Sequence, residues 1–340
     1  MTKQLTYKQN VNFGCDPEFF FSKSGKTVGA EKVLPENGLK FGDSKIIIDG
    51  VQAELNPSPR DCRALLGSEI GRCFKKVDEQ LKTLKGLKIS SSTTVKVTKK
   101  EMSSLSEKSQ KFGCSPSKNL SGDSEMSIKD ASKYMSRSAG GHIHIGLSQN
   151  DSNVRRVLGN HDVLVQILDI IVGNTCVLID RDKGNIERRK VYGKAGEYRT
   201  PPHGVEYRTL SNFWLRSYQL FGMVMGLTRQ SVHICTDGFA DKFIKLVDRE
   251  KIVKAINTND YDLAMQNFKA ILPLLLKITP ENNGYSVHGG NIKEFMYFIE
   301  KGIDYWFKEE MLEHWVKHIY GKAGFELFLK REVLSDMEKS

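Results

Sequence analysis

The chain has 340 residues, of which 39% are hydrophobic and 27% are charged, and its formal net charge is +10. This is the composition of an ordinary globular protein, long enough to bury a core without disulfides or structural metals. Membrane-spanning helices are excluded, because the longest apolar runs, at 163–172 and 271–276, are too short to cross a bilayer.

The first hundred residues predict short strands and turns. Residues 13–21 are extended and aromatic, and residues 45–49 form a β-branched run. Asp49-Gly50 is a turn signal that leads into a further strand over 51–55. We therefore expect a β-hairpin at this place.

A helix is expected after the prolines that end this hairpin. Apolar residues recur at helical spacing from Leu65 to Leu84, which predicts a helix over 61–84 with a cap near Ser58 or Asp61.

The rest of the chain divides into three regions that differ in composition and hydrophobic pattern. Residues 101–138 are rich in Ser, Lys and Gly, which predicts a long loop or a lid-like excursion. Residues 139–220 return to strands, interrupted by a long apolar helix over about 153–178. Residues 221–340 are mainly helical by pattern, and an apolar stripe from Phe295 to Trp315 predicts core packing.

Cysteines and charges narrow the class of protein. No two of the six cysteines fall in a C-x-x-C spacing, which argues against a thiolate zinc site and against a dense disulfide framework. With the polar start of the chain, this predicts a reducing, cytoplasmic location. Basic residues gather modestly at 75–100 and 188–190, which is compatible with nucleic acid or with an anionic substrate such as a nucleotide. No nucleic-acid motif accompanies them.

Four short segments share one design, in which two polar residues flank a less polar one. They are Asp16-Pro17-Glu18, Glu54-Leu55-Asn56, His142-Ile143-His144 and Glu206-Tyr207-Arg208. In a strand, residues two apart point to the same face, so each segment presents a polar pair from one side of a sheet. Carboxylates gathered on one face repel one another and need a cation among them. Oxygen ligands with one or two imidazoles favour Mg²⁺ or Mn²⁺ over Zn²⁺.

Arginines supply what a phosphate beside such metals would need. Arg199 and Arg208 flank Thr200-Pro-Pro-His-Gly204, and Arg188 and Arg189 lie just upstream. Their guanidinium groups match phosphate oxygens bidentately. The turn over 192–196 could lie against a nucleotide or be a simple hairpin turn. The chain has no P-loop and no kinase signature set.

The order of these motifs resembles the glutamine synthetase and glutamate–cysteine ligase superfamily. Within it, the chain is more similar to the phage-encoded carboxylate–amine ligases (amidoligase type 2, phiEco32-like), over residues 10–220. The strings that carry the resemblance are Gly14-Cys-Asp-Pro-Glu18, Gly140-Gly-His-Ile-His-Ile-Gly146 and Glu197-Tyr-Arg-Thr-Pro-Pro-His-Gly-Val-Glu-Tyr-Arg208.

The resemblance implies an α+β fold. Its centre would be a glutamine-synthetase-like antiparallel curved β-sheet (half-barrel) with helices packed on its outer face. Residues 1–225 would form this catalytic part, with the 101–138 loop inserted, and residues 226–340 a helical C-terminal region packed on it.

The resemblance also implies an ATP-dependent ligase that forms an amide through an acyl-phosphate, with Mg²⁺ or Mn²⁺. Arg199, Arg208 and Glu206 would be catalytic, and both arginines would hold the γ-phosphate and the acyl-phosphate. The nucleotide side would comprise His144, Arg188, Arg189, Arg199 and Arg208. The metal ligands would be Asp16, Glu18, Glu54, His142 and Glu206. Asp16 stands where the superfamily usually has Glu, and Glu197 is a candidate for a further acidic ligand.

Alternatives stay open at this point. A guanidino-type phosphotransferase of the same superfamily would make no amide, and a metallohydrolase would not need ATP. A phage structural or nucleic-acid-binding protein could retain the fold without catalysis. For the ligase, the partners would be a small-molecule or peptide carboxylate and an amine, in the host cytoplasm if the chain is phage-encoded. The sequence does not specify an oligomeric state.

Overall fold

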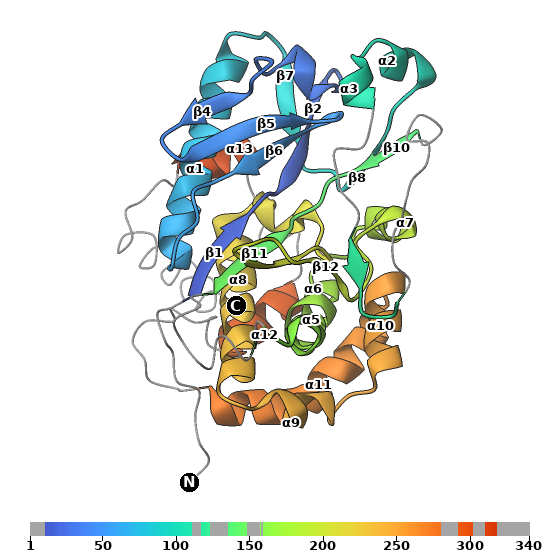
Figure 1. Ribbon diagram of the computed structural model, residues 1–340. Coiled ribbons are helices and arrows are strands. Elements are labelled where there is room, and N and C mark those ends of the chain that lie inside the picture. The colour runs from blue at the N-terminus through green and yellow to red at the C-terminus, as the bar shows by residue number, and fades with distance from the viewer. Residues whose placement is uncertain are drawn as a thin grey trace.

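The computed structural model describes residues 11–110, 117–122, 135–147, 157, 159–279, 292–301 and 310–317 (Figure 1). Two antiparallel sheets form the centre. The five-stranded sheet has the order β1 (Val11–Cys15), β11 (Ile143–Leu147), β13 (Gly204–Tyr207), β12 (Glu197–Arg199) and β9 (Lys118–Asn119). The other has the order β3 (Lys26–Val28), β2 (Glu18–Lys23), β6 (Gln52–Asn56), β5 (Ser44–Asp49) and β4 (Leu39–Phe41), with β7 (Leu87–Ser90) also paired to β2. A separate ribbon pairs β8 (Thr94–Lys96) with β10 (Ser136–Ser138).

The two large sheets are joined where β1 passes into β2. The amide of Asp16 donates to the His142 carbonyl at 3.4 Å, and the amide of Glu18 donates to the Gly140 carbonyl at 2.9 Å. The Leu55 amide donates to the Pro17 carbonyl at 3.0 Å. Backbone pairing therefore continues across the break between the strands, and the two sheets form one bent antiparallel layer. The expected α+β fold around a curved antiparallel sheet is confirmed.

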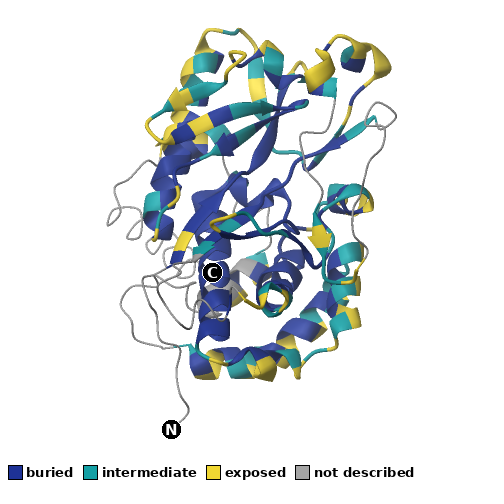
Figure 2. Ribbon diagram, in the orientation of Figure 1, coloured by how far each residue is buried: buried dark blue, intermediate teal, exposed yellow. Residues whose placement is uncertain are grey.

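Helices cover this layer in two groups (Figure 1). The N-terminal group comprises the short η1 (Ala30–Lys32), then α1 (Arg63–Lys82), α2 (Lys99–Ser103) and α3 (Glu107–Gln110). The group beneath the five-stranded sheet includes α5 (His161–Leu168), η3 (Asp169–Gly173), α6 (Asn174–Val177), α8 (Tyr218–Thr236), α9 (Ala240–Ile244), α10 (Arg249–Thr258) and α11 (Tyr261–Ile278). The remaining helices are α7 (Gly184–Val191), η4 (Asn212–Arg216), α12 (Ile292–Lys301) and α13 (Met311–Lys317). Every residue of α8 is buried, so this helix runs through the core (Figure 2).

The expected elements of the first hundred residues are present. The hairpin of β5 and β6 turns at Gly50, whose φ of 62° suits glycine. The expected helix is α1, but it begins later than predicted. Its N-cap is Cys62, next to Asp61 and so near the expected place, but it makes no side-chain cap hydrogen bond.

Later elements depart further from the pattern. The long apolar helix is described from 161 to 177 and contains a π-helical turn over 169–173, while most of 153–160 lies outside the described residues. The segment 101–138 is not all loop, because α2, α3, β9 and β10 fall wholly or partly in it; its remainder at 111–116 and 123–134 is not described.

Helix α13 of the helical C-terminal region packs against α1 and η4; the division into a catalytic part and a C-terminal region stays a prediction. The Trp315 ring of α13 stacks on Phe74 of α1, with centroids 5.8 Å apart, and its indole nitrogen donates to the Leu215 carbonyl at 2.6 Å. In the predicted apolar stripe, Ile299, Met311 and Trp315 are buried but Met296 is 45% exposed; the side chains of Phe295, Phe298, Ile303, Trp306 and Phe307 are not described. Helix α8 is continuous across the boundary placed after residue 225.

Among the described helices, none combines the length and the apolar character that crossing a membrane requires.

Candidate active site

The register of the five-stranded sheet brings one row of polar side chains together. His144 of β11 pairs with Glu206 of β13, and Glu206 pairs in turn with Arg199 of β12. Directly paired residues in antiparallel strands point to the same face. Their chain neighbours Ile143 and Tyr207 are paired and fully buried on the opposite face. The same-face prediction therefore extends across three strands.

The first cluster forms where this row meets the junction of the two sheets. Asp16 Oδ2 lies 3.1 Å from His144 Nε2, and Asp16 Oδ1 lies 3.3 Å from His142 Nδ1. His142 Nδ1 is also 3.7 Å from Glu206 Oε1. One ligand atom each from Asp16, His144 and Glu206 lie within 4.8 Å of one another. The family resemblance implies His142 as the metal ligand and His144 for the nucleotide side, whereas this group of three contains His144.

The second cluster consists of three carboxylates in the other sheet. Glu18 of β2 and Glu54 of β6 are directly paired, and Asp49 at the end of β5 joins them. One oxygen from each lies within 4.8 Å of the others. Like charges placed opposite each other in a sheet are destabilising. This arrangement therefore calls for a cation.

Hydrogen bonds hold Glu18 and Glu54 in place. Glu18 Oε2 accepts from the Gly140 amide at 2.6 Å and from the Tyr192 hydroxyl at 3.2 Å. Glu54 Oε1 accepts from Asn56 Nδ2 at 2.6 Å. Glu18 Oε1 is buried and has no hydrogen-bond partner among the described residues. An oxygen left in this way suits a metal ligand.

The two clusters differ in charge balance. Burial, with the nearby Asp49 charge, raises the pKa of Glu18 to about 8. Burial also raises the pKa values of Asp49 and Glu54, and the Asp16 charge adds to both. For Asp16, burial alone would raise the pKa, but His142 and His144 hold it well below its ordinary value. In the second cluster, burial and carboxylate repulsion therefore outweigh the nearby arginines, and its all-oxygen donors fit Mg²⁺ or Mn²⁺.

Of the four arginines, Arg199 and Arg208 lie at the first cluster, whereas Arg188 and Arg189 have other partners. Arg199 and Arg208 both donate to Glu206 Oε1, at 2.5 and 2.9 Å. The Arg199 side chain is 29% exposed and so is accessible to a ligand. Arg188, fully buried, donates to the carbonyls of Thr209 and Arg208 and thereby braces the end of β13.

Arg189 points elsewhere. It donates to Asn259 Oδ1 at 3.0 Å, and burial lowers its pKa to about 10, with the Arg188 charge contributing. The expected nucleotide contacts of Arg188 and Arg189 stay predictions, and these bonds favour structural roles for both.

Glu197, the further acidic candidate, is engaged by the turn beside it. Its Oε2 accepts from the amides of Gly193 and Lys194 at 2.5 and 3.1 Å. Gly193 has a φ of 79°, and a Cβ there would meet the Arg188 guanidinium at 2.2 Å. The Glu197 carboxylate therefore stabilises this turn, and the Arg188 guanidinium packs against the turn at Gly193.

Three residues of the site were missed by sequence reasoning. Asp49 was considered only as part of a turn, although it ends an apolar strand as a metal ligand can. Tyr192 binds Glu18 from a distant segment, which no local pattern reveals. His203 Nε2 lies 3.1 Å from His144 Nδ1 and extends the first cluster outward.

The glycine pair before His142 should be sensitive to substitution. A Cβ on Gly141 would lie 2.3 Å from the Ser211 carbonyl oxygen and 2.4 Å from Trp214 Nε1. We expect Gly141→Ala to lower the free energy of unfolding by about 1–3 kcal/mol, the usual cost of overpacking. Urea denaturation measures this. Gly14→Ala on the neighbouring strand is the control, because its Cβ would meet nothing nearer than 3.5 Å. Equal stability of the two variants would contradict the expectation.

Comparisons with known proteins identify the family of the chain. A family model described as phage phiEco32-like COOH.NH2 ligase-type 2 matches residues 125–316, more than half of the chain. A search of curated proteins found no match. Among solved structures, the chain is similar to the crystal structure of the complex between prokaryotic ubiquitin-like protein Pup and its ligase PafA. The TM-score is 0.46 and the identity 11%, over 97% of this chain and 68% of that one.

Proposed function

The chain belongs to the phage phiEco32-like COOH.NH2 ligase-type 2 family, and on this premise we propose an ATP-dependent ligase that forms an amide through an acyl-phosphate. Membership makes the chain a carboxylate–amine ligase. The use of ATP and of divalent metals is the proposed part. A ligase that consumes ATP would act in the cytoplasm.

One observation carries the proposal: two carboxylate clusters lie at the junction of the sheets, with two arginines on the Glu206 side. We assign one divalent cation to Asp16, His144 and Glu206, with His142 beside them, and another to Glu18, Asp49 and Glu54. Bound there, Mg²⁺ or Mn²⁺ would neutralise phosphate oxygens.

Arg199 and Arg208 have complementary roles in the proposal. Arg199 is partly exposed, so its guanidinium can bind the γ-phosphate of ATP and then the acyl-phosphate. Arg208 is buried against Glu206 and keeps that carboxylate ionised and fixed. Burial would raise the pKa of Glu206, but His142, Arg199 and Arg208 together lower it.

The reaction would proceed in two steps. An oxygen of the substrate carboxylate attacks the γ-phosphorus and ADP leaves, which gives the acyl-phosphate. The amine nitrogen then attacks the acyl carbon, phosphate leaves, and a proton is lost from nitrogen. Positioning and charge stabilisation suffice for such transfers, without a protein nucleophile.

ADP release is the test of this function. Purified protein would be incubated with ATP and Mg²⁺, with pools of carboxylates and amines alone and together. ADP release and a product heavier by the condensed amine, both only with the two pools together, are expected. A phosphorylated guanidine product would indicate the phosphotransferase instead. Salt-sensitive DNA binding without any ATP turnover would favour the non-catalytic alternative.

A further inference from the structure

Behind the row of active-site residues, on the helix side of the five-stranded sheet, a buried tyrosine meets a buried aspartate. Tyr207, the last residue of β13, directly follows Glu206 and so points to the opposite face. Its hydroxyl donates to Asp169 Oδ1 at 2.8 Å, and both residues have no exposed surface. The backbone that carries Glu206 is thereby tied to the helix layer.

Asp169 opens the π-helical turn η3. The amide of Asn174 donates to the Asp169 carbonyl, five residues back. Such turns are rare and are often found at functional sites, because the inserted residue shifts side chains relative to a regular helix. A Cβ on Gly173, at the end of this turn, would lie 2.4 Å from the Tyr207 hydroxyl. The turn and the tyrosine are therefore fitted closely to each other.

The Asp169 carboxylate also lies beside the start of β12 and beside helix α10. The backbone of Gly196, directly before β12, which carries Arg199, lies beside this carboxylate. Its Oδ2 lies 2.6 Å from Arg249 NH1 of α10. The Asp169 side chain thus contacts Tyr207 of β13 and lies beside the residue that precedes β12, in the hairpin that presents Glu206 and Arg199.

A core position this deep could hold an apolar residue if packing were its only task. Buried hydrogen bonds and ion pairs are strong at low dielectric and hold the groups they join in place. Catalytic groups must be held within about 0.5 Å of their productive positions. A network of such bonds lies on the helix side of the sheet and can hold the catalytic groups of the other face in position. Its members are Asp169, Tyr207, Gly196 and Arg249.

We propose that Asp169 is a positioning residue, which acts through Tyr207 and Gly196 to set where Glu206 and Arg199 stand on the opposite face. The effect of this positioning role on catalysis rests on the proposed function, whereas its effect on the geometry of the site does not.

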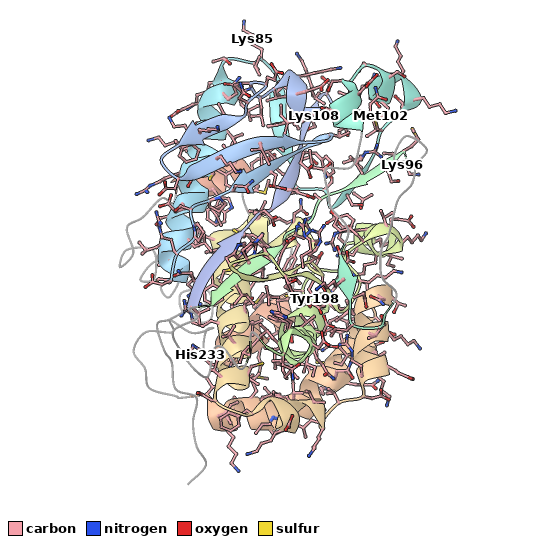
Figure 3. The ribbon with its side chains drawn as sticks, in the orientation of Figure 1. Lys85, Lys96, Met102, Lys108, Tyr198 and His233 are labelled. Atoms are coloured by element: carbon pink, nitrogen blue, oxygen red, sulfur yellow. The ribbon has the colours of Figure 1, made fainter. Side chains whose placement is uncertain are left out.

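Tyr207→Phe is the central variant, since it removes one oxygen from the network and keeps the ring. Gly173→Ala is the second, because its methyl group displaces the hydroxyl without removing a polar group. Tyr198→Phe is the matched control. Tyr198 of β12 is paired with Tyr207 of β13. It lies between β12 and α5 (Figure 3), and its hydroxyl donates to Asp162 Oδ1 at 2.8 Å.

Two readouts separate positioning from stability. The first is the kinetics of ADP release per folded protein, where we expect kcat to fall about tenfold to a hundredfold in Tyr207→Phe and Gly173→Ala with KM unchanged. A merely structural role would lower Tm and leave kcat of the folded fraction alone. Tyr198→Phe is expected to stay within twofold of the wild type.

The second readout is a pair of crystal structures, of the wild type and of Tyr207→Phe. We expect the Glu206 carboxylate or the Arg199 guanidinium to move by more than about 0.5 Å. Unchanged positions of both groups would overturn the proposal, whatever the activity. If the wild type released no ADP with any acid and amine, the proposed function would fail while this comparison still decided the positioning role.

Discussion

Glu206→Gln is expected to reduce amide formation on the order of 10³-fold, the scale seen when a preorganised charge is removed from an active site. Glu206 touches every part of the first cluster: it lies with Asp16 and His144, and it receives both Arg199 and Arg208. Glutamine keeps the shape of the side chain but neither binds a divalent cation as strongly nor balances two guanidinium charges. ADP release with both substrates present measures the loss.

Stability must be followed in the same variant. Arg208 is 1% exposed, and removing the partner of a buried charge costs about 3–5 kcal/mol. Circular dichroism at low temperature gives the folded fraction, so turnover can be stated per folded molecule. Glu206→Asp, which keeps the charge, should be more stable than Glu206→Gln. Folded Glu206→Gln with wild-type turnover would refute the assignment of this residue.

Glu197→Gln is the matched control for Glu206. Both are buried glutamates in adjacent strands of one hairpin, but Glu197 binds the amides of Gly193 and Lys194. A glutamine oxygen can accept the same bonds. We expect turnover within a few-fold of the wild type, and a loss as large as that of Glu206→Gln would instead make Glu197 part of the machinery.

Divalent cations are expected to stabilise the protein more at pH 8 than at pH 6, and Glu18→Gln should remove most of this difference. Glu18 has a pKa of about 8 in the folded chain against an ordinary value of 4.5. Between these values the folded state holds the proton more tightly than the unfolded state, so stability without a cation falls as pH rises. A cation competes with that proton, and its affinity therefore rises with pH up to about 8.

Thermal denaturation with and without Mg²⁺ at the two pH values measures this effect. A cation at a hundred times its Kd contributes about 2.7 kcal/mol, which raises Tm by several degrees. Glu69→Gln serves as the control, since Glu69 is a buried glutamate outside both clusters, paired with Arg60 and Arg72. An equal shift of Tm at both pH values in the wild type would contradict the assignment of Glu18.

The sequence allowed the same-face pairs to be predicted because a strand alternates its side chains whatever it pairs with. It did not reveal the pairing itself. That His144 stands opposite Glu206, or Glu18 opposite Glu54, depends on a register set by distant core residues. Whether His142 or His144 completes the group with Asp16 depends on that register too.

The consecutive arginines show a second limit. Neighbouring residues on a helix point about 100° apart, so Arg188 and Arg189 of α7 cannot face one ligand equally. Arg188 meets backbone carbonyls at the end of β13, and Arg189 meets Asn259 beside α10. The sequence of consecutive arginines is typical of a phosphate site, but the contacts of each side chain depend on the fold. The lysines of 75–100 are a simpler case: Lys85 and Lys96 lie exposed at the periphery (Figure 3).

The packing of α13 has a consequence for how the chain is made. Trp315 fills a place between Phe74 of α1 and Phe221 of α8. Helix α1 leaves the ribosome early, while the indole that covers its apolar face is among the last described residues to emerge. Until α13 is made, the part of that face that Trp315 covers stays open to association with other chains. The N-terminal sheet and its helix are therefore expected to complete their packing only once α13 has been synthesised.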